Sequence, residues 1–350
     1  MPRKTDQQLL DELLAQYEGT IRQAFLEAIE QIKSDIVLRI IIEFLERGDV
    51  FGAVDAMQIE AGSFPGLERA FQQAYFGGGQ ATVDNFPLVK GPDGNRVVFR
   101  FGVRNPAGEA FLREHSSTMV TRIAEDQREA IRQHLTTGLE AGRNPRQTAL
   151  DVVGRVNRAT NRREGGIIGL TAPQERYVTA ARAELLSTDP KDLTAYLERS
   201  RRDKRFDRTV RKAIKEGKSV DAAMVDKIVG RYSDRLLDLR GEMLARTETL
   251  TALNKARDDA IRQQIAEGKI DAQDIQKIWR SAHDARVRLT HAVLDGKTAP
   301  MDGVFHSPSG AVLMHPGDPK APALETVGCR CVLEYRVDWI GALARKQRAA

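Results

Sequence analysis

The hydrophobic positions near the start of the chain recur at steps of three and four residues. Between Asp6 and Arg47 the repeating positions are Leu9, Leu10, Leu13, Leu14, Ile21, Phe25, Ile29, Ile32, Ile36 and Ile40. Such a stripe covers one face of a helix, so it predicts amphipathic helices that bury this face. Gly48 follows the pattern and predicts its end. We therefore expect an N-terminal helical region over residues 1–60.

Residues 61–108 have a different composition. Gly77, Gly78 and Gly79 are consecutive, and the sequence Gly91-Pro92-Asp93-Gly94-Asn95 separates two short segments, of which the second is Arg96–Val103. Turn residues between two short segments predict a β-hairpin. This region is therefore expected to be a glycine-rich segment that contains a hairpin.

Helical periodicity returns at residue 109 and continues to about residue 268, which predicts a helical bundle. Two of its breaks carry helix-start signals. The stretches Thr171-Ala172-Pro173-Gln174-Glu175 and Ser187-Thr188-Asp189-Pro190 each offer a capping side chain near the proline that begins a helix. A long helix from about Met224 has its own buried stripe. The positions of that stripe are Val225, Ile228, Val229, Tyr232, Leu236, Leu239, Met243, Leu250 and Leu253.

Two polar residues interrupt the apolar side of this long helix. Arg246, Leu250 and Asn254 fall within one arc of the helix, so Arg246 and Asn254 need partners if they are buried. Glu248 is near in sequence but points away from Asn254. We interpret Arg246 and Asn254 as parts of a structural polar network rather than as catalytic groups.

The chain beyond Asp295 is rich in glycine, proline and histidine and has short β-like segments at 310–314 and 331–335. It predicts a small α+β unit over residues 269–340, followed by a basic tail at 341–350. The predicted fold class is mainly α: a multi-helix body with a small β-hairpin insertion and a small α+β C-terminal unit.

Composition sets limits on the partners. The 350 residues carry a formal charge of +5, which permits an anionic partner without requiring one. The longest apolar run, Ile36–Leu45, is short and contains Arg39 and Glu43, so no membrane association is expected. The start of the chain lacks the apolar core of a secretory signal.

One basic segment is a candidate for binding DNA without sequence preference. It contains Arg199, Arg201, Arg202, Lys204, Arg205, Arg208, Arg211 and Lys212, with acidic residues only at Asp203 and Asp207. Cations of this kind bind phosphates through counterion release. The alternative interpretation is a solvated helix face, which is common in helical proteins.

The C-terminal segment contains both cysteines, Cys329 and Cys331, and four of the six histidines. A disulfide between residues this close would be strained, so we expect thiols or metal ligands. On a strand both sulfurs would face the same side, and His291 and His315 could complete a zinc site. The alternatives are packed thiols with hydrogen-bonded histidines, or a nucleophilic Cys329 paired with one of these histidines.

The order of several C-terminal motifs resembles the phage head morphogenesis family, to which the protein F of phage Mu and a minor head protein of phage SPP1 belong. The resemblance extends over residues 125–339 and includes linker helices at 131–145 and 162–170. Its motif residues in this chain are Arg246, Glu248, Asn254, Trp279, Asp284, Arg286, His291, Gly296, Pro316, Cys329 and Cys331. One departure is Gly328, where the family usually has asparagine before Cys-Arg-Cys.

The resemblance implies a minor capsid protein of a tailed bacteriophage, without a catalytic role. It would be carried in the virion, inside the capsid or at the portal vertex, after assembly in the host cytoplasm. Its partners would be the portal protein or the major capsid protein, with packaged DNA as a further partner, and it would contribute to head assembly or DNA delivery. The alternatives are a zinc- or thiol-dependent hydrolase and a sequence-independent DNA-binding protein.

Overall fold

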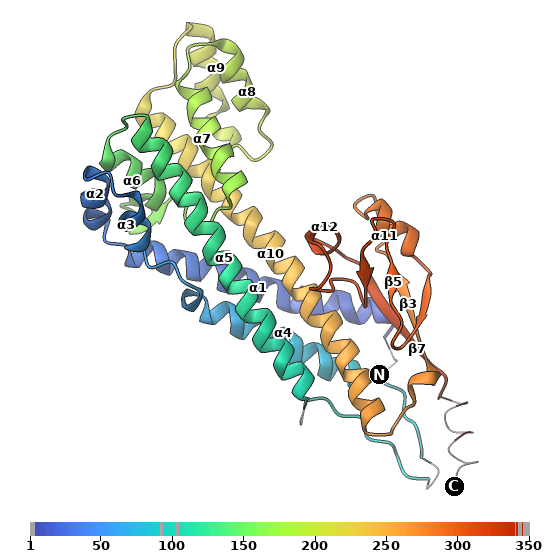
Figure 1. Ribbon diagram of the computed structural model, residues 1–350. Coiled ribbons are helices and arrows are strands. Elements are labelled where there is room, and N and C mark those ends of the chain that lie inside the picture. The colour runs from blue at the N-terminus through green and yellow to red at the C-terminus, as the bar shows by residue number, and fades with distance from the viewer. Residues whose placement is uncertain (1–3, 92–93, 103–104, 340, 342–344, 346–350) are drawn as a thin grey trace. The chain divides into compact units, whose positions relative to one another are not determined.

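The structure is a computed structural model that describes residues 4–91, 94–102, 105–339, 341 and 345 (Figure 1). Helices make up most of the described chain, and the strands are short, so the predicted mainly α fold is confirmed. Of the predicted basic tail, residues 342–344 and 346–350 lie outside the described residues.

The chain divides into two compact units, and each unit combines segments that are distant in sequence. The terminal unit consists of the chain up to Ala24, Gly66–Ser116 and the chain from Glu242, whereas the central unit consists of Phe25–Pro65 and Ser117–Gly241. Three long helices supply residues to both units: α1 (Asp6–Asp35), α5 (Pro106–Glu140) and α10 (Ala222–Ala266). The division into five consecutive segments stays a prediction.

The central unit is built almost entirely from helices. Besides parts of the long helices, its elements are α2 (Leu38–Glu46), α3 (Val50–Asp55), the 3-10 helix η1 (Ala61–Ser63), α6 (Pro145–Val153), β1 (Arg155–Asn157), β2 (Arg162–Glu164), α7 (Ala172–Leu186), α8 (Pro190–Glu198), the 3-10 helix η2 (Lys204–Phe206) and α9 (Asp207–Glu216). The two predicted helix starts are confirmed, each with a capping side chain. Thr171 accepts a hydrogen bond from Gln174 N at the start of α7, and Asp189 accepts one from Lys191 N at the start of α8.

The expectation of a linker helix at residues 162–170 is wrong. β1 and β2 form an antiparallel hairpin, in which Arg155 pairs with Glu164. Gly165 and Gly166 follow with φ angles of 71° and 80°, which a right-handed helix cannot contain. The backbone also passes close to α10 here, since a Cβ on Gly165 would lie 2.7 Å from Gly230 Cα.

The terminal unit combines the long helices with a compact C-terminal α+β part. Its further elements are α4 (Pro65–Asp84), the 3-10 helix η3 (Ala272–Asp274), β3 (Ile275–Arg280), α11 (Leu289–Leu294), β4 (Thr298–Pro300), β5 (Phe305–His306), β6 (Val312–Leu313), α12 (Ala323–Thr326) and β7 (Val332–Val337). β3 is the central strand of an antiparallel sheet with the order β4-β3-β7, in which Trp279 pairs with Leu333. β5 and β6 form a separate short ladder.

The three consecutive glycines lie inside helix α4, within the region expected to be a glycine-rich segment with a hairpin. Their missing side chains allow close packing within the terminal unit. A Cβ on Gly77 would overlap the Tyr17 hydroxyl, and one on Gly79 would overlap the Phe101 ring. The predicted hairpin has fewer paired residues than expected, because its described part contains one antiparallel bridge, between Lys90 and Arg96. Part of its turn and Val103 lie outside the described residues.

Most of the predicted stripe residues are buried, but Met243 is 40% exposed. The Met243 side chain packs against the turn at Gly328, because a Cβ on Gly328 would lie 2.8 Å from Met243 Cε. At this position the helix therefore contacts a turn and not the hydrophobic core. Gly328 has a φ of 65°, a left-handed conformation that glycine and asparagine tolerate best. This explains why glycine can stand where the family usually has asparagine.

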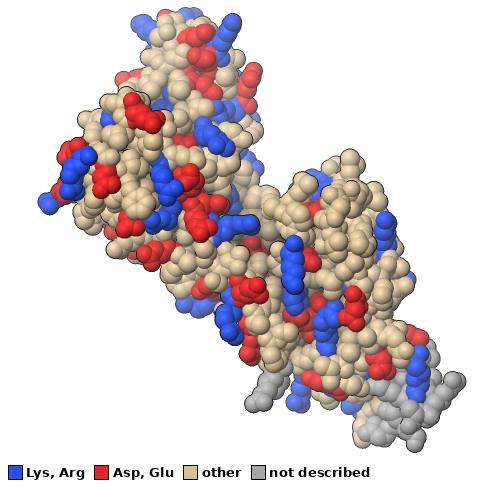
Figure 2. All heavy atoms as spheres, viewed as in Figure 1, with Lys and Arg blue, Asp and Glu red and all other residues tan. Residues whose placement is uncertain are grey.

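The visible surface carries charges of both signs in mixed arrangement, in keeping with the small net charge (Figure 2). Among the described helices, no stretch has the length and apolar character that a membrane crossing requires.

Candidate functional site

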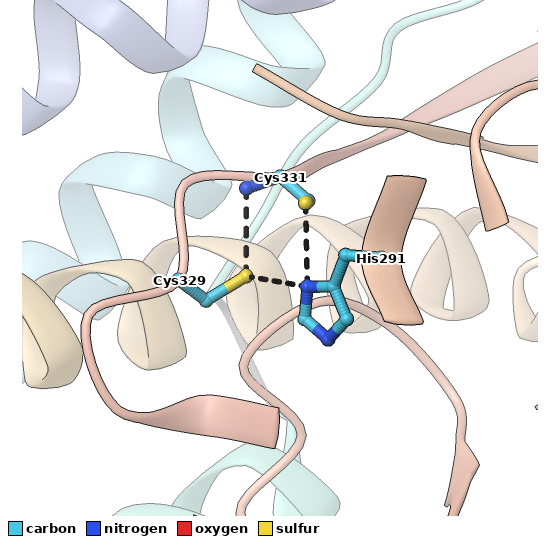
Figure 3. A group of neighbouring side chains, drawn as sticks. All are labelled: His291, Cys329 and Cys331. Atoms are coloured by element: carbon cyan, nitrogen blue, oxygen red, sulfur yellow. Dashed lines mark hydrogen bonds between the residues drawn. The ribbon is translucent and has the colours of Figure 1, made fainter. Parts of the chain in front are cut away.

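A histidine and both cysteines meet in the C-terminal α+β part of the terminal unit (Figure 3). His291 lies on α11, and the cysteines lie in the segment between α12 and β7. His291 Nδ1 is 3.5 Å from Cys329 Sγ and 3.4 Å from Cys331 Sγ. His291 is 1% exposed and each cysteine 2% exposed. We call these three residues the thiol–histidine cluster.

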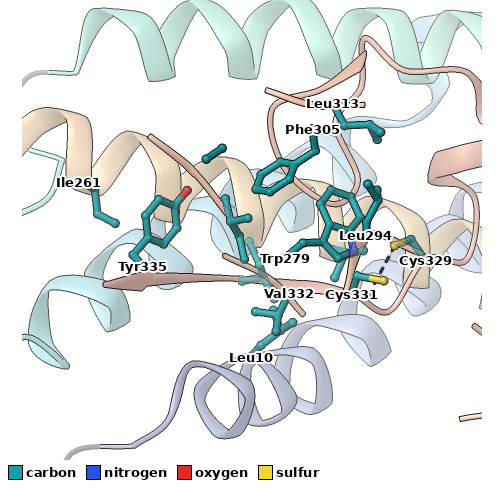
Figure 4. Packing of buried hydrophobic residues seen from close by; sticks show 14 of the residues in the cluster. Leu10, Ile261, Trp279, Leu294, Phe305, Leu313, Cys329, Cys331, Val332 and Tyr335 are labelled. Carbon is teal, nitrogen blue, oxygen red and sulfur yellow. Dashed lines mark hydrogen bonds between the residues drawn. The ribbon is translucent and has the colours of Figure 1, made fainter. Parts of the chain in front are cut away.

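An apolar core surrounds the thiol–histidine cluster. Trp279, on β3, is fully buried and its ring meets the His291 ring edge to face, with 5.1 Å between the ring centroids. Phe305 packs on the other side of Trp279, with 5.3 Å between the centroids, and Leu294 and Leu313 belong to the same core (Figure 4). The cluster is therefore shielded from water by residues of β3, β5, β6 and α11.

Glu325, at the end of α12 nearest the cluster, contacts the opposite nitrogen of His291. Its Oε2 lies 2.7 Å from His291 Nε2, and both residues are buried. Ser307 Oγ donates to Oε1 at 2.9 Å, Ser309 Oγ donates to the same oxygen, and Thr290 Oγ1 donates to Oε2 at 3.2 Å. Burial alone would raise the pKa of Glu325, but the hydroxyl donors and His291 outweigh it and lower this pKa.

The two thiols have different electrostatic surroundings. The hydrogen bond with Cys331, supported by His291, lowers the pKa of the Cys329 thiol against the effect of burial. The same hydrogen bond and burial raise the pKa of Cys331. The backbone N–H of Cys331 also donates to Cys329 Sγ at 3.5 Å. Cys329 is therefore the sulfur that ionises more readily.

His315, the other predicted metal ligand, does not join the thiol–histidine cluster. It is buried, and its Nδ1 lies 3.1 Å from Pro316 O. The turn that contains it is tied to α10, because Asn254 Nδ2 donates to Pro316 O at 2.9 Å and Thr251 Oγ1 donates to Gly317 O at 3.1 Å. His315 is thus placed among groups that hold this turn on the long helix.

The polar residues on α10 have separate partners. Arg246 forms an ion pair with Glu18 at 2.7 Å, and Glu248 contacts His115 Nε2 at 2.7 Å. Since Asn254 bonds instead to the backbone at Pro316, these residues hold different parts of the terminal unit together.

The remaining motif residues shape the loop between β3 and α11. Asp284 forms a bidentate ion pair with Arg330, the residue between the two cysteines. Asp284 also accepts a hydrogen bond from Arg286 N at 2.9 Å. Gly296 has a φ of 75° at the turn that follows α11. These contacts fix the positions of the segments that carry the cluster.

Ion pairs engage part of the predicted basic segment in the central unit. Arg199 pairs with Glu184 at 2.6 Å, and Arg202 pairs with Asp207 at 3.0 Å. Arg205 pairs with Asp203 at 2.6 Å. The remaining cations are exposed: Arg201, Lys204, Arg208, Arg211 and Lys212. Phosphate binding by this segment stays a prediction, with fewer available charges than the sequence suggested.

No sequence pattern marks Glu325 or a second buried pair in the central unit. There, His134 Nδ1 on α5 lies 2.8 Å from Glu175 Oε1 on α7. His134 lines a cavity of about 530 Å³, at which Arg182 is paired with Asp226 and Asp151 at 2.6 and 2.8 Å. Arg155 pairs with the same two carboxylates, Asp151 at 3.1 Å and Asp226 at 2.8 Å, so two cations balance two anions in this group.

The fold and its closed C-terminal part define a mainly helical protein with a compact α+β module that is anchored on a long helix. Comparison with known families identifies this module. Residues 204–334 match the family described as Phage Mu protein F like protein. The resemblance to the phage head morphogenesis family is therefore confirmed over these residues, which include α9, α10 and the α+β part.

Among characterised proteins, the chain is similar to the minor head protein GP7 of Bacillus phage SPP1. The two are 42% identical over 65 residues, which is 19% of this chain and 21% of that protein. The match thus spans about a fifth of the length of this relative. No solved structure shows a significant match to the chain.

Proposed function

We propose that this chain is a minor head protein of a tailed bacteriophage that binds the portal or the major capsid protein and contributes to head assembly or DNA delivery. The observation that carries this proposal is the family match over residues 204–334, together with the similarity to a minor head protein. The family match covers most of the α+β module, so the module is the part to which we assign the interaction with other head components.

An exposed apolar surface on the α+β module supports this assignment. Leu289 and Val293 on α11 are 87% and 54% exposed, and Leu324 on α12 is 71% exposed. The two helices are neighbours, since Arg288 donates to Glu325 O at 3.4 Å. The surface over them carries few charges in the visible face (Figure 2). Neighbouring exposed apolar residues are typical of protein interaction sites.

The test is co-purification with the head. We expect the full chain to be present in purified virions or procapsids, and to co-purify with the portal or the major capsid protein when expressed together with each. The double variant Leu289→Ser, Leu324→Ser should weaken this association at least tenfold. Phe51→Ser, at a 68% exposed position of the central unit, is the matched control. Absence from virions and procapsids, with no co-purification, would refute the proposal.

A second candidate function is contact with packaged DNA through the exposed cations of the basic segment. Arg208 and Arg211 lie three residues apart on α9, and both are exposed. If this segment binds DNA, the logarithm of affinity should fall linearly with the logarithm of salt concentration, and Arg208→Ala with Arg211→Ala should reduce the slope by about 2. Affinity that does not depend on salt would contradict this function.

The burial of the cluster disfavours the thiol-dependent hydrolase alternative. Cys329 and His291 are close enough to act as nucleophile and base, but a substrate would have to reach a sulfur of a residue that is only 2% exposed. Alkylation of the native protein tests this point. Slow alkylation is expected of buried thiols, whereas rapid modification of Cys329 alone would favour a reactive nucleophile.

A further inference from the structure

The thiol–histidine cluster brings three atoms that can bind a metal to within 4.8 Å of one another. Both sulfurs lie 3.4 to 3.5 Å from one nitrogen, His291 Nδ1. That nitrogen carries either one proton or one lone pair, so it can make one well-aligned hydrogen bond and not two. A cation between the three atoms would contact all of them. We propose that His291, Cys329 and Cys331 bind one Zn²⁺ ion with a structural role.

The distances fit zinc. Zn–N bonds of about 2.0 Å and Zn–S bonds of about 2.3 Å at a tetrahedral angle place nitrogen and sulfur about 3.5 Å apart. The observed separations of 3.5 and 3.4 Å are within about 0.2 Å of this value, and all three donor atoms lie within 4.8 Å of one another. A zinc ion can therefore enter with small side-chain adjustments and without moving the backbone.

The surroundings of the cluster are those of a metal site. The Glu325 carboxylate, 2.7 Å from His291 Nε2, would hold the ring so that Nδ1 faces the metal, which is the usual carboxylate–histidine–metal arrangement. Ser307 and Ser309 fix that carboxylate in turn. The buried indole Nε1 of Trp279 lacks a hydrogen-bond partner in the described part of the chain. Because Trp279 lies beside Cys331 in Figure 4, a metal-bound thiolate there would offer this N–H an acceptor.

The donor set selects the metal. Two thiolates and an imidazole suit Zn²⁺, whereas Mg²⁺ and Ca²⁺ prefer oxygen ligands. Two thiolates and one Zn²⁺ sum to zero charge, which lowers the cost of burying the group in the apolar core. Among the described residues, no further histidine, cysteine or acidic side chain joins the three donors.

Bound zinc would connect α11 to the segment that leads into β7. His291 lies on α11, whereas both cysteines lie just before or at the start of that strand. The ion would fix the loop that Arg330 and Asp284 hold from outside by their ion pair. Its role would be to close a small core that a short three-stranded sheet alone stabilises weakly.

The test uses the full chain, produced without a histidine tag or chelators and analysed by elemental mass spectrometry. One Zn²⁺ per chain is expected. Cys331→Ser and His291→Ala should each lower the zinc content at least tenfold. His306→Ala, at an exposed position of the same α+β part, is the control and should retain zinc, as should His315→Ala.

A spectroscopic measurement keeps the proposal testable if these variants do not fold. Titration of the metal-free wild-type chain with Co²⁺ should produce a thiolate-to-cobalt charge-transfer band and the strong visible bands of tetrahedral cobalt, both abolished by an equivalent of Zn²⁺. A folded wild-type chain that takes up neither metal would overturn the proposal. Full zinc content in a double variant Cys329→Ser, Cys331→Ser would overturn it as well.

Discussion

Two buried histidine–glutamate pairs, one in each unit, have similar distances between nitrogen and oxygen. In the central unit, His134 Nδ1 lies 2.8 Å from Glu175 Oε1, and in the terminal unit His291 Nε2 lies 2.7 Å from Glu325 Oε2. Hydroxyl groups hold both carboxylates, since Thr179 Oγ1 donates to Glu175 at 2.6 Å and Ser307 Oγ donates to Glu325 at 2.9 Å. The pairs differ in what faces the other nitrogen of each ring.

The second nitrogen of each ring distinguishes the two pairs. His134 Nε2 has no hydrogen-bond partner among the described residues and its side chain lines a cavity, so this pair links α5 to α7 and has no further donor beside it. In the other pair, His291 Nδ1 faces two sulfurs. The same buried pair can therefore serve as a link between helices or as the support of a metal ligand, depending on its third partner.

Metal removal should have the largest effect on stability, and it should affect the terminal unit, which contains the His291–Glu325 pair. If the cluster holds zinc with free metal about a thousand times above the Kd, a chelator should lower the free energy of unfolding of the terminal unit by about 4 kcal/mol. Fluorescence during guanidinium unfolding measures this, because Trp279 and Trp339 are the two tryptophans of the chain and both belong to that unit. The His291→Ala variant should show no chelator effect. If the chelator leaves the unfolding midpoint of the wild-type chain unchanged, the proposed difference between the two pairs is wrong.

Matched substitutions of the carboxylates should have the next largest effect. Glu325→Gln should weaken zinc binding about 10- to 100-fold, since a supporting carboxylate typically contributes that much to metal affinity. Glu175→Gln should leave zinc affinity unchanged, because its carboxylate belongs to the other pair. Competition with a chelating dye measures both. Equal losses in the two variants would show that the effect comes from general destabilisation.

Sequence reasoning found the parts of this comparison that depend on local pattern. The spacing of Cys329 and Cys331 predicted two sulfurs on one side, and the sequence named His291 as their partner, which the structure places beside both. The helical stripes and the caps at Thr171 and Asp189 also follow local rules, so these elements were predictable.

Features that depend on tertiary packing were not predictable in the same way. Nothing near Glu325 or Glu175 in the sequence marks a histidine partner, because the fold alone brings the two residues of each pair together. His315 was predicted as a metal ligand by residue type, but its turn is held on α10 by Asn254 instead. The helical packing of the glycines of α4 was not predictable, because their packing partners, Tyr17 and Phe101, are distant in sequence.

The contribution of the His134–Glu175 pair to the free energy of unfolding should depend on pH. Burial alone would raise the pKa of Glu175, but hydrogen bonds from His134 and Thr179 outweigh it and lower this pKa below the ordinary value of 4.5. A carboxyl group with a lowered folded-state pKa stabilises the fold above its unfolded pKa, and this stability is lost as pH falls through the folded pKa.

Wild type should therefore exceed Glu175→Gln in stability by about 1 to 2 kcal/mol at pH 7, and the difference should shrink below about pH 4.5. Urea unfolding at several pH values, followed by circular dichroism, measures it. Glu198→Gln, at an exposed position of α8, controls for the change in net charge. A difference that grows toward low pH would show that the sign is wrong.

The hydroxyl donors should have the smallest effects, and these should again differ between the pairs. Thr179→Val keeps the shape of the side chain but removes one hydrogen bond to Glu175, so it should cost about 1 kcal/mol of stability in urea unfolding. Thr194→Val is the matched control, because its exposed hydroxyl bonds only to Pro190 O within α8. Ser307→Ala should instead lower zinc affinity by less than tenfold, since Ser309 and Thr290 still hold the Glu325 carboxylate. If Ser307→Ala changes stability without changing zinc affinity, Glu325 acts as a packing group, and the two pairs have the same role.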